Sequence, residues 1–96
     1  MEDLLKKYGK FKLCDEAVKT ERFDILIWLI EKYDKTISAR ISDTAAASGN
    51  LHILEWMHKH KYHLSEYICE TAAEGGYLHI LEWGHANHIL KRIKWH

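Results

Sequence analysis

Histidine is the residue type in this sequence whose number and spacing most suggest chemistry. All eight histidines follow Leu51, and the three-residue spacing of His85 and His88 places both on one face of a helix. Two such imidazoles can hold a metal ion, but no Cys or Asp stands beside them at the spacing of a zinc site. We therefore predict solvated histidines on helix faces, with no metal site and no cofactor. A metal-linked or pH-responsive unit is the weaker alternative.

Cysteine and the common catalytic motifs give no sign of an enzyme. Cys14 and Cys69 are too few for a disulfide framework, and the sequence contains no GxGxxG, P-loop, GxSxG or HExxH motif. A nucleophilic thiol also needs an activating neighbour. We therefore predict small, buried cysteines in a protein that is not an enzyme.

The charge of the chain is balanced, with 14 Lys and Arg against 14 Asp and Glu. A broad surface for nucleic acid or for an anionic membrane would need an excess of basic residues. No apolar run is long enough to cross a membrane, and the acidic start Met1-Glu2-Asp3 is unlike a signal peptide. We expect a cytoplasmic protein that binds neither nucleic acid nor membrane.

An internal repeat organises the chain. Residues 44–56 read TAAASGNLHILEW and residues 71–83 read TAAEGGYLHILEW, with ten of 13 positions identical at an offset of 27. A weaker copy lies 28 residues upstream and aligns Ala17 with Ala45 and Ala72. The same register places Cys14, Ser42 and Cys69 at one small-residue position. Three units stacked on one another are therefore expected, because one unit cannot bury its apolar face alone.

Each unit reads as two short helices joined by a tight turn. In the third unit the first helix is predicted over residues 65–74, with Ser65 as its N-cap, and the second over residues 78–87. Gly75-Gly76 forms the turn between them. Leu78, Ile80, Leu81 and Gly84 are expected to face inward. The residues assigned to the structural core are Cys14, Ala17, Ala45, Ala46, Leu54, Cys69, Ala72, Ala73 and Leu81.

The segments AAASGNLHIL and AAEGGYLHIL resemble the ankyrin repeat, in which an Ala pair lies in the first helix and a Gly turn opens the second. The units here are 27 or 28 residues long, against about 33 in the usual ankyrin repeat. The resemblance implies an all-α solenoid with reduced or absent β-hairpin fingers, similar to the ankyrin repeats of giant DNA viruses of amoebae. It covers residues 12–90. Glu21 replaces the turn glycine of the first copy, and Lys61 replaces the glycine after the second helix of the middle copy.

The chain is predicted to be one domain, residues 1–96. Within it, residues 1–9 are expected to form an N-terminal cap. The three repeats span residues 10–36, 37–63 and 64–90, and residues 91–96 are a tail or a truncated fourth repeat.

Two residue types recur where adjacent second helices should meet. Trp28, Trp56 and Trp83 hold one position and are expected to seal the seams between these helices, with an exposed aromatic ladder as the alternative. His58 and His85 also share a position. We expect them to face each other across a seam, so that protonation at low pH would oppose stacking.

The resemblance implies a protein-interaction module, because repeat solenoids bind other proteins on extended surfaces. A viral protein of this type would act in the host cytoplasm, on host or viral proteins. Contacts to an unidentified protein partner are expected from exposed first-helix and loop positions. These are Lys19, Thr20, Arg40, Ala47, Ser48, Lys61, Tyr62, His63, Tyr67 and Glu74. The alternative is a structural unit that self-associates weakly through its end repeats.

Overall fold

The computed structural model describes residues 2–33 and 35–87, and this part of the chain is helical without any strand. The helices are α1 (Glu2–Tyr8), α2 (Lys10–Lys19), α3 (Phe23–Lys32), α4 (Lys35–Ala47), α5 (Leu51–Lys59), α6 (Ile68–Glu74) and α7 (Leu78–Ala86). The fold is therefore all-α, as predicted. None of these helices has the length and apolar character needed to cross a membrane. Residues 88–90, assigned to the third repeat, and the tail 91–96 lie outside the described residues.

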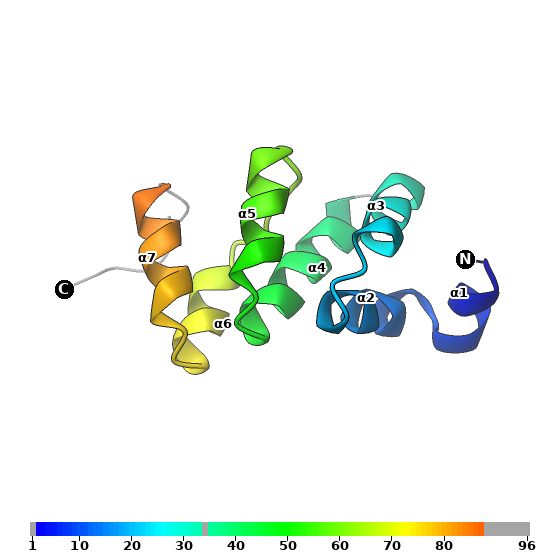
Figure 1. Cartoon of the computed structure of the whole chain (residues 1–96), viewed down its shortest axis with the longest axis horizontal. Coiled ribbons are helices and arrows are strands. Elements are labelled where there is room, and N and C mark those ends of the chain that lie inside the picture. The colour runs from blue at the N-terminus through cyan, green and yellow to red at the C-terminus, as the bar shows by residue number, and fades with distance from the viewer. Residues whose placement is uncertain (1, 34, 88–96) are drawn as a thin grey trace.

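The helices form an elongated row that measures 47 × 23 × 18 Å (Figure 1). α2 packs with α3, α4 with α5, and α6 with α7, so each pair corresponds to one sequence repeat. The first helices of the pairs also pack on one another, α2 on α4 and α4 on α6. α1 packs against α2 at the N-terminal end of the row, where Leu5 and Tyr8 contact the core.

The core follows the positions shared by the repeats. Ala17, Ala45 and Ala72 share one repeat position in the first helix of each pair, and all three are buried. Small side chains at such positions allow helix backbones to approach closely, which fits the direct packing of the first helices. Other buried residues recur at the Cys, Ile and Leu positions: Cys14, Ser42, Cys69, Ile25, Ile53, Ile80, Leu26, Leu54 and Leu81.

The turn inside each pair is closed by the same hydrogen bond. The amides of Arg22, Asn50 and Tyr77 each donate to the carbonyl of the alanine five residues earlier, at 2.9, 2.8 and 2.9 Å. This bond needs a left-handed residue just before the donor. Gly49 and Gly76 supply it with φ of 71° and 72°, and Glu21 adopts φ 52° in the first pair. The first turn therefore has the same geometry as the other two, although Glu21 stands there in place of glycine.

The connection between α5 and α6 differs from the sequence prediction. α6 begins at Ile68 and not at Ser65, because hydroxyls of α4 hold the preceding backbone. Ser38 Oγ donates to the carbonyl of His63 at 2.6 Å, and the Ser65 amide donates to Ser42 Oγ at 2.8 Å. Ser65 Oγ in turn accepts from the amide of Tyr67 at 3.1 Å. Lys61 starts this connection in the left-handed region, with φ 60°.

Two residues of the third unit lie differently from the prediction. Ala73 was assigned to the core but is exposed, whereas Ala46 at the same repeat position is buried. Leu78 was expected to face inward but is 67% exposed. Ala73 and Leu78 lie on α6 and α7, the last described helix pair, and on the side where no further described helix covers them. Repeat position alone therefore does not decide burial at the end of the row.

Candidate protein-binding surface

An open hollow crosses the three first helices. Its volume is about 430 Å³, and side chains of α2, α4 and α6 and of the turn after α4 line it. We call it the first-helix hollow, and its residues are Asp15, Lys19, Arg40, Asp43, Thr44, Ala47, Ser48 and Thr71. The structure thus brings together Lys19, Arg40, Ala47 and Ser48, four of the residues expected to contact a partner.

The other residues expected at the partner surface lie outside the hollow. Thr20, Lys61, His63, Tyr67 and Glu74 are exposed, and the Thr20 hydroxyl donates to the carbonyl of Glu16 at 2.8 Å. Tyr62 is half-buried, with its ring centroid 5.2 Å from that of Trp56. None of these residues lines the hollow itself.

Asp15 is the centre of a polar cluster at one end of the hollow. Its carboxylate accepts from Arg40 Nη2 at 3.0 Å and Nε at 3.4 Å, and from the Thr44 hydroxyl at 2.9 Å. These bonds join α2 to α4. The hydrogen bond that Arg40 donates to Asp15 raises the pKa of Arg40 above its ordinary value, and the guanidinium also lies over the Phe11 ring, 5.4 Å from its centroid. Arg40 is therefore held in place on both sides.

Asp43 lies in the same hollow with a different environment. Its Oδ1 atom is buried and accepts no hydrogen bond within the described part of the chain. Asp43 is half-buried, and Thr71 of α6 lines the hollow beside it. Sequence analysis missed both Asp15 and Asp43. The signal that identifies them is their shared place in the repeat, two residues before Ala17 and Ala45.

Trp28, Trp56 and Trp83 are half-buried, and Trp56 and Trp83 lie at the seams between second helices as expected. The Trp56 ring on α5 meets Phe23 on α3 edge to face, at 5.1 Å between centroids. Trp83 on α7 meets His58 on α5 in the same manner at 5.8 Å. In the first pair, Lys32 lies over the Trp28 ring and forms an ion pair with Glu2 of α1 at 3.1 Å.

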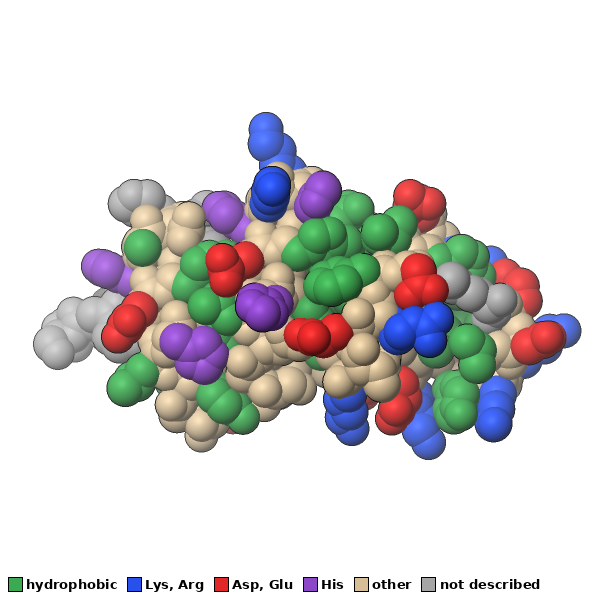
Figure 2. Space-filling view, in the orientation of Figure 1, with side chains coloured by type: hydrophobic (Ala, Val, Ile, Leu, Met, Phe, Trp, Pro, Cys, Tyr) green, Lys and Arg blue, Asp and Glu red, His purple; other side chains and the backbone are tan. Residues whose placement is uncertain are grey.

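The described histidines lie over the half of the molecule that carries α5 and α7 (Figure 2). His58 and His85 do not face each other as expected: the His58 ring meets Trp83, while His85 lies on the far side of α7. The two imidazole rings therefore lie on opposite sides of α7 and do not meet. Among residues 2–33 and 35–87, no three His, Cys, Asp or Glu side chains lie together as metal ligands require.

Two histidines instead connect successive turns. His79 Nε2 lies 3.1 Å from the carbonyl oxygen of Gly49, one unit earlier. His52 Nδ1 lies 3.9 Å from Glu21 Oε1, which also accepts from the Asn50 amide nitrogen at 3.1 Å. Histidine at this repeat position therefore contacts the preceding turn in both cases.

Both cysteines are buried thiols. Burial, with a smaller contribution from Asp15, raises the pKa of Cys14 to about 11, and burial also raises the pKa of Cys69. Because the thiolate is the reactive form, neither side chain is activated for nucleophilic chemistry.

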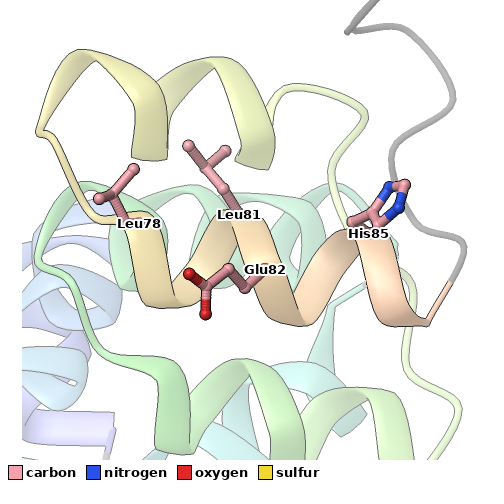
Figure 3. Close-up of a pocket in the computed structure, with 4 residues that line it drawn as sticks. All are labelled: Leu78, Leu81, Glu82 and His85. Atoms are coloured by element: carbon pink, nitrogen blue, oxygen red, sulfur yellow. The ribbon is translucent and has the colours of Figure 1, made fainter.

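An apolar surface lies on the outer side of α7, formed by Leu78, Leu81 and His85 with Glu82 at its border (Figure 3). We call it the α7 outer face. The corresponding side of α3 is covered by Trp56 and that of α5 by Trp83, as the ring contacts show. The α7 outer face thus carries the chemistry of an internal seam.

Comparisons with known proteins give no further assignment: no family model matches the chain, and neither the curated proteins nor the solved structures contain a significant match.

Proposed function

We propose that this chain is a non-catalytic protein-interaction module, built as an ankyrin-like solenoid of three helix–turn–helix repeats, which binds a protein partner across its first helices. Support for the repeat assignment comes from the turn bonds of Arg22, Asn50 and Tyr77, which recur once per unit. The stacking of α2, α4 and α6 supports the solenoid.

The observation that carries the function is the first-helix hollow. It spans all three units, as the binding surface of a repeat protein does. Its lining carries two carboxylates, Asp15 and Asp43, and two cations, Lys19 and Arg40. This balance is unsuited to a polyanion such as nucleic acid, which requires a basic surface. Its open shape also differs from the enclosed pockets that bind small molecules. A protein surface with complementary charges is the partner class that fits best.

Site-specific photo-crosslinking tests this proposal. A photoreactive amino acid at Ser48, inside the hollow, is compared with one at Glu55, an exposed position on α5. Both proteins are incubated with an extract of the source cells, with and without an excess of unlabelled protein. We expect a discrete adduct from position 48 that the unlabelled protein competes away. An unlabelled Lys19→Glu/Ser48→Arg competitor should fail to remove it, because that variant reverses one charge of the hollow and fills it.

The same experiment has a clear negative result. If positions 48 and 55 give the same adducts, or if the hollow variant competes as well as the native chain, the first-helix hollow is not the binding surface. Circular dichroism of each variant, which should stay helical, excludes unfolding as the cause.

The second candidate function is self-association, and the α7 outer face is the observation that favours it. Leu78 is 67% exposed there, next to Leu81. At the other end of the row, α1 packs on α2. Packing between the α7 outer faces of two copies therefore fits better than head-to-tail stacking. Sedimentation velocity over a hundredfold range of concentration decides: a dimer that Leu78→Glu abolishes supports this alternative, and a monomer throughout removes it.

A further inference from the structure

We propose that the first-helix hollow binds an arginine side chain of the partner protein, and that Asp43 is the residue that receives its guanidinium group. The inference rests on the proposed function and specifies the chemistry of the partner. It comes from a comparison of two carboxylates that hold the same position in successive repeats.

Asp15 shows what this position binds when a cation is present. Asp15 lies two residues before Ala17, and it takes the guanidinium of Arg40 and the hydroxyl of Thr44 from the next first helix. Arg40 lies five residues before Ala45, and Thr44 one residue before it. A carboxylate in this place thus has two donors, one charged and one neutral.

Asp43 holds the same place one unit later, two residues before Ala45. The positions equivalent to Arg40 and Thr44 are five residues and one residue before Ala72, which are Tyr67 and Thr71. The threonine is kept, but tyrosine stands where the arginine was, and tyrosine carries no positive charge. The repeat therefore retains the carboxylate without a cation from the next first helix, and the positive charge that acts on Asp43 in the hollow is that of Arg40 on its own helix.

The geometry of α6 keeps this place open. α4 begins at Lys35, so Arg40 lies well within the helix, whereas α6 begins at Ile68 and Tyr67 precedes it. The serine bonds to His63 and Ser65 hold the connection in this form. The outcome is the hollow beside Asp43, with the Oδ1 atom buried and unpartnered within the described residues. A buried carboxylate oxygen without a donor is costly, so a ligand that supplies a donor gains by binding.

Arginine fits this place better than other donors. Arg40 also lines the hollow and its charge acts on Asp43, but its Nη2 and Nε atoms are bound to Asp15, and no hydrogen bond joins Arg40 to the Asp43 Oδ1 atom. A guanidinium presents two parallel N–H groups that match a carboxylate, and it is less strongly hydrated than an ammonium group. The Asp15–Arg40 pair shows that this pairing already occurs on this surface.

The direct test uses a small probe in place of the partner. N-acetyl-arginine amide is titrated into the 15N-labelled full chain, with N-acetyl-citrulline amide as the neutral isostere. We expect saturable shifts of the amides of Asp43, Ala47 and Thr71, with a millimolar Kd, and at least fivefold weaker binding of the citrulline probe. Asp43→Asn should weaken the arginine probe at least fivefold. Glu55→Gln, which removes an exposed carboxylate from α5, should leave it unchanged.

A second variant tests the same place without removing the carboxylate. Tyr67→Arg supplies the cation within the chain, so it should raise the melting temperature and block the arginine probe. The inference is overturned by any of three results: no saturable shift in the hollow, equal binding of both probes, or equal binding to the native chain and to Asp43→Asn. If crosslinking from position 48 still captures a partner after such a result, the arginine site is wrong and the proposed function stands. Without that adduct, the proposed function fails independently of the arginine probe.

Discussion

Between α2 and α4 the polar bonds run from side chain to side chain, whereas between α4 and α6 they run from side chain to backbone. At the contact between α2 and α4, called here the first seam, Asp15 of α2 binds Arg40 and Thr44 of α4. At the contact between α4 and α6, called the second seam, Ser38 and Ser42 of α4 bind the connection that precedes α6. The apolar positions are shared by both seams.

The difference follows from two repeat positions. Ser38 and Ser42 in the middle unit correspond to Lys10 and Cys14 in the first unit. Neither a lysine nor a buried thiol replaces a serine hydroxyl as a donor and acceptor for backbone. α4 therefore begins as early as Lys35, whereas the chain that leads into α6 stays outside the helix until Ile68. The two serine hydroxyls thus accompany the shorter helix α6 and the hollow beside Asp43.

The largest expected effect tests the apolar packing that the seams share. Ala46→Leu adds three carbons at a buried position between α4 and α6, and it should destabilise the protein by about 1–3 kcal/mol through overpacking. Ala73→Leu, at the same repeat position but exposed, should change stability by less than about 0.5 kcal/mol. Urea unfolding measures both. Equal losses would mean that α6 is covered on its outer side.

The next effect tests the backbone bonds of the second seam. Ser42→Ala leaves the buried amide of Ser65 without its acceptor and should cost about 1–2 kcal/mol. Amide exchange at Ser65 should quicken more than exchange in α2. Ser48→Ala, an exposed control, should do neither. Unchanged protection of the Ser65 amide would show that the connection does not depend on this hydroxyl.

The corresponding position of the first unit gives a pH prediction. Burial raises the pKa of Cys14 from 9.0 to about 11, so the folded chain keeps its thiol proton at a pH where the unfolded chain has lost it. The Cys14 contribution is therefore complete below pH 9 and decreases as pH rises toward 11, with about 1 kcal/mol lost by pH 10. Urea unfolding at pH 8 and pH 10 should show this loss in the native chain and not in Cys14→Ala. Parallel losses in both proteins would contradict it.

The smallest of these effects concerns the turns beside the two seams. Glu21→Gly places glycine at a left-handed position, as Gly49 already does one unit later, and should stabilise the protein by roughly 0.5 kcal/mol. The gain is limited because the Glu21 carboxylate binds Asn50. Glu21→Ala, which loses the carboxylate and keeps the strained backbone, is the matched control. A glycine variant no more stable than the alanine variant would show that the turn is unstrained.

The repeat made much of the fold predictable. It gave the helix pairs, the turns and most buried positions, because stacked units place equal residues in equal surroundings. It failed at Ala73 and Leu78, since burial there depends on whether another unit follows. It also failed at the start of α6, where the deciding bonds come from serines 23 and 25 residues earlier in the chain.

The candidate surface was predictable only in part. Exposure at Lys19, Arg40, Ala47 and Ser48 follows from helix periodicity, and all four line the first-helix hollow. The roles of Asp15 and Asp43 do not follow from periodicity, because each depends on a residue about one repeat away. Arg40 and Tyr67 hold the same repeat position, and the change from arginine to tyrosine indicates that Asp15 and Asp43 differ. This comparison is informative only once the helices are known to pack in this register.

The difference between Asp15 and Asp43 is the central claim, and one pair of unfolding measurements tests it most directly. Asp15→Asn and Asp43→Asn make the same chemical change at the same repeat position, and urea unfolding gives the free energy of each. Asp15→Asn should cost about 1 kcal/mol, since it weakens a partly exposed ion pair and a hydroxyl bond to a carboxylate. Asp43→Asn should be neutral or stabilising. A loss at Asp43 equal to that at Asp15 would show that Asp43 already has its cation and would contradict the account.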